Sequence, residues 1–120
     1  ADAIPWQRAL DKGCDRVIVV LTRPRSYRRR PDHMLELIRR RYRKYPAFVE
    51  LMEHRAELYN RDRERLFRAE REGKLLVIAP VSTLGVARTE RDTEKLRLLW
   101  AEGYQSAVDR MEEIRALLRG

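Results

Sequence analysis

The sequence predicts an α/β fold in which two short parallel strands belong to a sheet larger than the chain itself builds. Two apolar runs, residues 17–21 and 75–79, are too short for helices, and the first is mostly β-branched. Helical periodicity fills the stretch between these runs and the stretch after the second. Because two strands alone make a poor sheet, further strands are expected from a missing N-terminal part, a second copy or a partner.

The chain opens with a predicted helix over residues 5–12. Pro5 suits the first helical position, where its missing N–H is not needed, and Gly13 supplies a left-handed stop. A strand over 16–22 follows. Its five consecutive apolar residues predict burial on both faces, as in a parallel sheet covered by helices.

Two helices are expected between the strands. The first begins at Asp32, an N-cap candidate. Its apolar stripe, which places both tyrosines in the core, is Leu35, Ile38, Tyr42 and Tyr45. Pro46 breaks this helix and begins the next, which ends at Gly73.

The second strand is predicted over 74–79 and is followed by a loop over 80–91. Asp92 then caps one long C-terminal helix, whose apolar stripe runs from Leu96 to Leu118. The predicted order is therefore helix-strand-helix-helix-strand-helix, with both strands parallel and a right-handed crossover between them. A chain of 120 residues fits a single unit, 1–120, with one core.

The net charge of +8 is concentrated in residues 23–44, which hold ten Lys/Arg and two Asp/Glu. The stretch begins where the first strand ends, and ligands of open α/β sheets bind beyond the carboxyl ends of strands. Guanidinium groups suit phosphate and carboxylate oxygens. The candidate residues for binding an anion or a phosphate head group are Arg23, Arg25, Arg28, Arg29, Arg30, Arg39, Arg40, Arg43 and Lys44.

No catalytic constellation is evident in the sequence. None of Ser26, Ser82 and Ser106 lies in a Gly-x-Ser-x-Gly elbow, and the two histidines and single cysteine make no metal-site spacing. We therefore expect neither a metal nor a cofactor. Cys14, expected to be a small buried side chain, is alone, which indicates a reducing compartment. With no membrane-span pattern, we expect a protein that is cytoplasmic or peripheral at the inner membrane surface.

Several short motifs resemble bacterial patatin-like phospholipases. The longest is GCDRVIVVLTRP at residues 13–24, followed by Tyr27. The others, in the same order as in that family, are Arg43-Lys44-Tyr45-Pro46, Tyr59-Asn60, Val77-Ile78-Ala79-Pro80, Arg88, Asp92 and Gly103-Tyr104. The resemblance spans nearly the whole chain and covers the C-terminal portion of the family.

Patatin-like proteins are α/β serine hydrolases that cleave acyl esters of lipids with a Ser–Asp dyad. The resemblance implies that residues 1–31 end the catalytic core and that 32–120 form a helical C-terminal portion with one strand. The family's serine elbow and Asp-Gly motif are absent here, and Asp2 is followed by Ala3, so no catalytic role is transferred to it. The expected function is that of a C-terminal structural and lipid-docking part, inert alone. The Arg-rich stretch would meet anionic lipid, and the partners would be the remainder of the hydrolase domain or a second copy.

Two alternatives remain open from the sequence. Tyr27, Tyr42 and Tyr45 stand among arginines, a pattern found in nucleic-acid-binding proteins. An exposed strand edge or the last helix would instead make the chain a self-association module.

Overall fold

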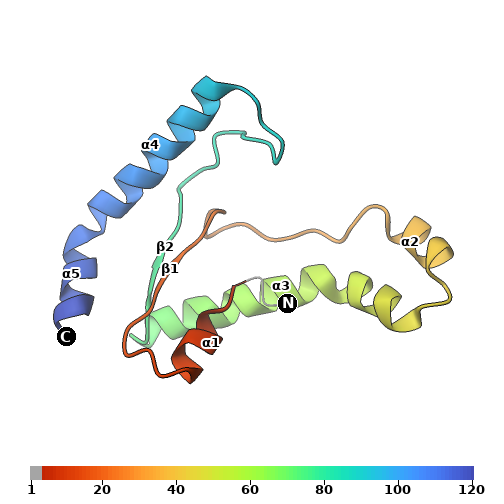
Figure 1. The fold of residues 1–120 in the computed structure, drawn as a ribbon, viewed down its shortest axis with the longest axis horizontal. Coiled ribbons are helices and arrows are strands. Elements are labelled where there is room, and N and C mark those ends of the chain that lie inside the picture. Colours follow the sequence, from red (N-terminus) through yellow and green to blue (C-terminus); the bar gives the residue numbers. More distant parts are fainter. Residues whose placement is uncertain (1–3) are drawn as a thin grey trace. The chain divides into compact units, whose positions relative to one another are not determined.

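The computed structural model describes residues 4–120 and confirms the mixed α/β class, with two parallel strands in one sheet and a helical C-terminus (Figure 1). Asp2 lies outside the described residues. The elements are α1 (Trp6–Asp11), β1 (Ile18–Val20), α2 (Leu35–Arg41), α3 (Pro46–Arg71), β2 (Leu76–Ile78), α4 (Thr93–Asp109) and α5 (Met111–Arg119).

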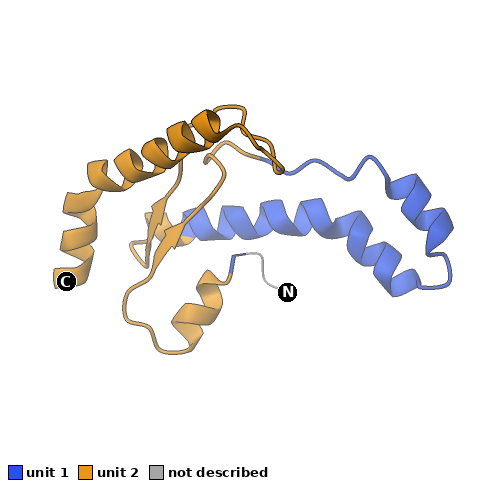
Figure 2. Cartoon of the chain, turned by 45° about the horizontal axis from the view of Figure 1, so that its top comes forward, with its two compact units in different colours: residues 1–4, 28–68 blue, residues 5–27, 69–120 orange. Residues whose placement is uncertain are grey.

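The chain divides into two compact units, coloured separately in Figure 2. The helical unit contains Ile4 and Arg28–Arg68, and therefore α2 and most of α3. The sheet unit contains Pro5–Tyr27 and Ala69–Gly120, and therefore both strands and helices α1, α4 and α5.

The sheet unit is built around the parallel pair of β1 and β2, in which Val19 is in register with Val77. Beyond the strand ends, the Leu76 N–H donates to the Val17 carbonyl at 3.1 Å and the Leu21 N–H donates to the Ile78 carbonyl at 2.8 Å. All of β2 is buried, as its unbroken apolar sequence predicts. The buried side chains of this unit are Trp6, Val17, Val19, Leu21, Ala69, Leu75, Leu76, Val77 and Ile78.

The prediction that the first strand is buried on both faces is wrong for this chain. Val17, Val19 and Leu21 are buried, whereas the alternating Ile18 and Val20 are 36% and 69% exposed. Successive strand side chains point to opposite faces, so Val17, Val19 and Leu21 pack on one face of the sheet. Ile18 and Val20 lie on the other face, where their partners Leu76 and Ile78 are buried but they themselves are exposed. The continuous apolar sequence suits a strand covered on both sides, and within residues 4–120 the second face is covered at β2 but only partly at β1.

Four of the predicted start and stop signals are confirmed, whereas Pro5, predicted as the first helical residue, is the N-cap of α1. Gly13 and Gly73 have φ angles of +90° and +77°, so each reverses the chain after a helix in a conformation that disfavours side chains. Pro46 is the first residue of α3. Asp92 caps α4 by accepting hydrogen bonds from the backbone N–H groups of Glu94 and Lys95, at 3.0 and 3.4 Å.

The single long C-terminal helix of the prediction is two helices, α4 and α5, which meet at Arg110. Arg110 adopts φ −101° and ψ 9°, outside the helical region. Its side chain donates a 2.8 Å hydrogen bond to the Val77 carbonyl and pairs with Glu113. The apolar stripe continues through the break, so periodicity alone does not reveal it.

The helical unit corrects two further expectations. Asp32 shapes a turn before α2, where its carboxylate accepts the Met34 N–H at 2.9 Å, and α2 itself is shorter than the predicted helix. Tyr42 and Tyr45, expected in the core, are 40% and 64% exposed, because the helix ends before them. In the sheet unit, Cys14 is likewise exposed and not buried.

Candidate functional site

The nine predicted anion-binding residues are divided between the two units. Arg23 and Arg25 belong to the sheet unit, and the other seven, from Arg28 to Lys44, belong to the helical unit. The helical unit also carries most of the excess charge. Residues 28–68 hold thirteen Lys/Arg and seven Asp/Glu, a net charge of +6.

Arg25 forms part of an ion-pair network at the outer edge of β2. Its guanidinium donates to both carboxylate oxygens of Glu70, at 2.6 and 2.9 Å, and to the Val77 carbonyl at 3.0 Å. Glu70 also accepts the Val77 N–H at 3.0 Å, and Arg110 lies 4.0 Å from the same carboxylate. The hydrogen bond from Arg25 is the main reason that the pKa of Glu70 lies below its ordinary 4.5. Arg25 therefore holds the sheet together. Its neighbour Arg23 stacks over the Tyr27 ring at 5.0 Å.

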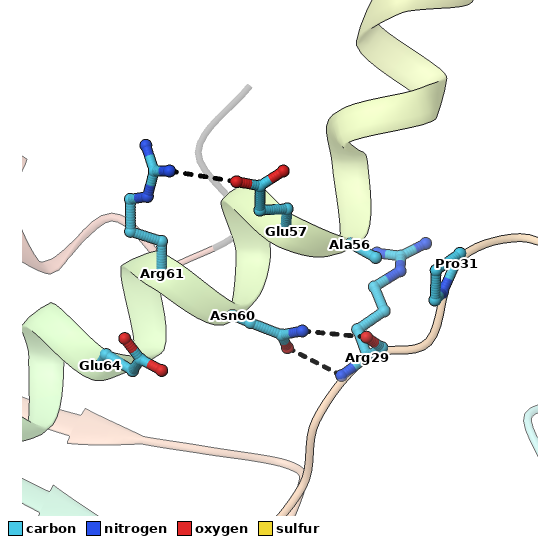
Figure 3. Close-up of a pocket in the computed structure, with 7 residues that line it drawn as sticks. All are labelled: Arg29, Pro31, Ala56, Glu57, Asn60, Arg61 and Glu64. Carbon is cyan, nitrogen blue, oxygen red and sulfur yellow. Dashed lines mark hydrogen bonds and ion pairs between the residues drawn. The ribbon is translucent and has the colours of Figure 1, made fainter.

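Asn60 clamps the loop that carries Arg29. Its side-chain oxygen accepts the Arg29 N–H at 2.8 Å, and its amide nitrogen donates to the Arg29 carbonyl at 2.9 Å (Figure 3). A side-chain amide offers both a donor and an acceptor, so Asn60 serves this backbone as a neighbouring strand would. The Arg29 guanidinium lies 5.7 Å from the centre of the Tyr59 ring. Charge counting missed Asn60. The Tyr59-Asn60 pair among the family-like motifs was the one signal that pointed to it.

A cleft of about 380 Å³ opens beside this clamp. It is lined by Arg29, Pro31, Ala56, Glu57, Asn60, Arg61 and Glu64 (Figure 3). Arg61 pairs with Glu57 at 3.2 Å, on the wet side of α3 as their spacing predicts. Two arginines and two glutamates line this cleft, so it does not favour a simple anion.

Some of the predicted arginines are neutralised by carboxylates. Arg39 donates to Glu53 at 2.7 Å and pairs with Glu36 at 3.3 Å, and Arg40 lies 3.7 Å from Glu36. The hydrogen bond to Glu53 is the largest cause that raises the pKa of Arg39 above its ordinary value. Arg39 also lines a second cleft, of about 490 Å³, with Arg43, Glu50, Glu53 and other residues.

In the part of the helical unit that belongs to the basic stretch, residues 28–44, four exposed cations stand without a carboxylate partner. Within residues 4–120, no ion pair or hydrogen bond engages the side chains of Arg30, Arg41, Arg43 and Lys44. We call these four residues the uncompensated set. Their charge is fully available to an external anion, in contrast to that of Arg25 and Arg39.

An apolar pocket of about 180 Å³ lies in the sheet unit, at the carboxyl ends of β1 and β2 and beside α4. Its lining is Val20, Leu21, Thr22, Ile78, Ala79, Pro80, Leu99, Gly103 and Ser106. Ligands of open α/β sheets bind at this end of the strands. A side chain added at Gly103 would meet no atom within 4 Å, so the space beside α4 is open.

The serines have local structural contacts. Ser82 accepts the Leu84 N–H at 3.0 Å, and Ser106 donates to the Glu102 carbonyl at 2.9 Å within α4. Among residues 4–120, no group of three His, Cys, Asp or Glu side chains is placed to hold a metal ion. In the same part of the chain, no helix has the length and apolar character needed to cross a membrane.

Comparison with known proteins gives one match. The profile of a family described as a domain of unknown function (DUF6363) matches residues 45–119, which include α3, β2, α4 and α5. No curated protein and no solved structure matches the chain.

Proposed function

This chain belongs to the family described as a domain of unknown function (DUF6363), and we propose that it is the C-terminal structural and lipid-docking part of a patatin-like serine lipid acyl hydrolase. Two observations support the proposal. The family-like motifs follow one another in the order found in patatin-like proteins, from Gly13 to Gly103-Tyr104. The parallel pair of strands, in which Ile18 and Val20 of β1 are left exposed, fits a piece of a larger α/β sheet.

The docking role is carried by the uncompensated set. Arg30, Arg41, Arg43 and Lys44 are exposed and have no carboxylate partner within residues 4–120. A cation already paired to a glutamate gains little from a lipid phosphate, whereas an unpaired one gains the full attraction. Basic side chains near an anionic leaflet contribute roughly 1 kcal/mol each, and salt screens that attraction over about 10 Å. Four such residues are enough for reversible docking.

Co-sedimentation with vesicles tests this role. We expect the full chain to bind vesicles containing phosphatidylglycerol, to bind neutral phosphatidylcholine vesicles weakly, and to lose binding as salt is raised. Replacing the uncompensated set with glutamine should remove most of the binding. In a matched control variant, glutamine replaces Arg8, Lys12, Arg88 and Arg119, so the same amount of charge is lost elsewhere in the chain. This control should retain most of the vesicle binding. Equal binding to neutral and anionic vesicles at low salt would end the docking proposal.

The hydrolytic chemistry of the proposed whole protein would lie in its catalytic part. There, an aspartate would activate a serine hydroxyl as general base, and the resulting acyl-enzyme would be hydrolysed by water. We expect no esterase activity from residues 1–120 alone. The coding sequence that precedes this segment in the genome provides the test. A Gly-x-Ser-x-Gly elbow and an Asp-Gly pair are expected there, and an unrelated sequence would contradict the proposal.

Binding of single-stranded RNA is a second candidate, favoured by one observation. Tyr42 and Tyr45 are 40% and 64% exposed and stand beside Arg41, Arg43 and Lys44 in the sequence. Exposed aromatic rings among cations stack with bases. However, Tyr42 already packs edge-on against Phe48, with ring centres 4.9 Å apart. A filter-binding series with single-stranded RNA across salt concentrations separates this function from lipid docking.

A further inference from the structure

The two outer edges of the sheet differ in the hydrogen-bond partners of their outward backbone groups. At the edge of β2, the N–H of Val77 donates to Glu70, and its carbonyl accepts from both Arg25 and Arg110, at 3.0 and 2.8 Å. These are the groups that an adjoining strand would need. Glu70 is only 18% exposed, and Arg25 holds its carboxylate from the other side. The side-chain network therefore closes this edge to further strands.

The edge of β1 is open. The Val17 carbonyl and the Leu21 N–H face β2, so in a parallel ladder the backbone groups of Ile18 and Val20 face the opposite way. Within residues 4–120, these outward groups of Ile18 and Val20 have no hydrogen-bond partner. No charged side chain or proline of β1 itself protects this edge, in contrast to the usual features of edge strands.

The side chains of β1 agree with its open backbone edge. Ile18 and Val20 share a face of the sheet with their partners Leu76 and Ile78, which are buried, yet Ile18 and Val20 themselves are 36% and 69% exposed. Exposed β-branched residues on an unprotected strand are a liability unless another element covers them. The open backbone edge and the two exposed apolar side chains therefore belong to the same strand.

We propose that the β1 edge is a strand-acceptor site, where an extended apolar segment rich in β-branched residues adds to the sheet. We assign that segment to the catalytic part of the proposed hydrolase, and this assignment of its source rests on the proposed function. The backbone of Ile18 and Val20 supplies the hydrogen bonds, and apolar side chains of the incoming strand cover the two exposed side chains. The sheet then grows in one direction only, away from the closed edge of β2.

The size of the strand argues against a second copy as the occupant. β1 has three residues, which span about 10 Å at the rise of a strand. The surface area buried when two such strands pair edge to edge is far smaller than the roughly 1,200 Å² that a stable interface between folded proteins buries. A strand that belongs to a larger folded part does not have this limit, because the elements around it cover Ile18 and Val20.

The test uses the 120-residue chain labelled with ¹⁵N and a synthetic peptide of alternating valine and threonine flanked by lysines. The peptide is N-methylated on alternate residues, so that it presents one hydrogen-bonding edge and does not pair with itself. We expect its addition to shift the amide resonances of Ile18 and Val20 while that of Val77 stays unchanged. A peptide methylated on both edges is the matched control, and it should bind at least tenfold more weakly.

A variant of the chain tests the same edge from the other side. Val20→Pro removes an outward N–H and leaves the hydrogen bonds to β2, and proline is tolerated at strand edges. We expect the peptide to bind this variant at least tenfold more weakly. Val20→Thr keeps the N–H and the side-chain shape and should bind it as the wild type does. If Val20→Pro fails to fold, the pair of methylated peptides still decides the question.

Three results would overturn the strand-acceptor site. The first is that the peptide leaves every resonance unchanged, and the second is that it shifts Val77 instead of Ile18 and Val20. The third is that the chain forms a dimer through β1 that the peptide does not displace. The first two remove the site, and the third assigns it to a second copy. Failure of the vesicle experiment alone would leave the strand-acceptor site intact, so the two proposals fail separately.

Discussion

Substitution of Glu70 by glutamine should destabilise the sheet unit more than any other conservative change of a carboxylate. The carboxylate accepts three hydrogen bonds, two from Arg25 and one from the Val77 N–H. Glutamine keeps the volume but carries one acceptor oxygen and no charge, so it cannot hold both groups. Hydrogen bonds to charged groups contribute about 1.5–3 kcal/mol each in protected sites.

The partial exposure of the pair lowers that figure. The Arg25 side chain is 44% exposed, so water screens its attraction to Glu70. The Val77 N–H is buried, and losing its acceptor costs roughly 1–3 kcal/mol. We therefore expect Glu70→Gln to lower the free energy of unfolding by about 2–3 kcal/mol.

Urea denaturation followed by circular dichroism and tryptophan fluorescence measures this loss, because Trp6 is buried in the same unit. Glu72→Gln is the matched control. Glu72 pairs at 3.1 Å with Lys74, and both side chains are about half exposed or more, so its loss should cost less than about 0.5 kcal/mol. Equal stability of the two variants would refute the role assigned to the network at the β2 edge.

Three further outcomes are expected. The pKa values of Glu70 and Glu113 are lowered, chiefly by hydrogen bonds from Arg25 and Arg110, so their contribution to stability is present above the ordinary 4.5 and is lost as the pH falls through the lowered values. Unfolding free energies measured across the acid range should show this slope, and Glu70→Gln should flatten it. Asp92→Ala removes the cap of α4 and should cost about 1 kcal/mol by urea denaturation, and an unchanged midpoint would contradict the cap. Leu66→Ala, at a fully buried position of the helical unit, should cost about 2–5 kcal/mol, and a loss under 1 kcal/mol would show that Leu66 is not a core residue.

The sequence predicts the elements well where the signal is local. Gly13, Gly73, Pro46 and Asp92 act within a few residues of their own position, through backbone conformation or a single hydrogen bond. Such effects do not depend on what packs nearby. The order of the elements and the parallel pairing followed from these signals and from the two apolar runs.

The remaining features depend on contacts that the sequence order does not reveal. At the break between α4 and α5, the Arg110 side chain donates a hydrogen bond to the Val77 carbonyl of β2, which lies 33 residues away in the chain. The exposure of Ile18 and Val20 depends on which elements surround β1, while the residues of β1 fit a fully buried strand equally well. Tyr42 belongs to an apolar stripe, but the helix ends before it, and a stripe does not say where its helix stops.

Charge counting has the same limitation, and this matters for function. Arg25 and Arg41 look alike in a run of basic residues, yet Arg25 closes the edge of the sheet and Arg41 has no partner within residues 4–120. The stretch over 23–44 therefore has two roles. Its first part contains Arg25, which occupies the outer edge of β2. Its later part contains the exposed cations that an anion can bind. Removing the whole stretch would unfold the sheet unit and abolish binding together. Only variants confined to the uncompensated set separate docking from stability, because their side chains hold nothing else in place.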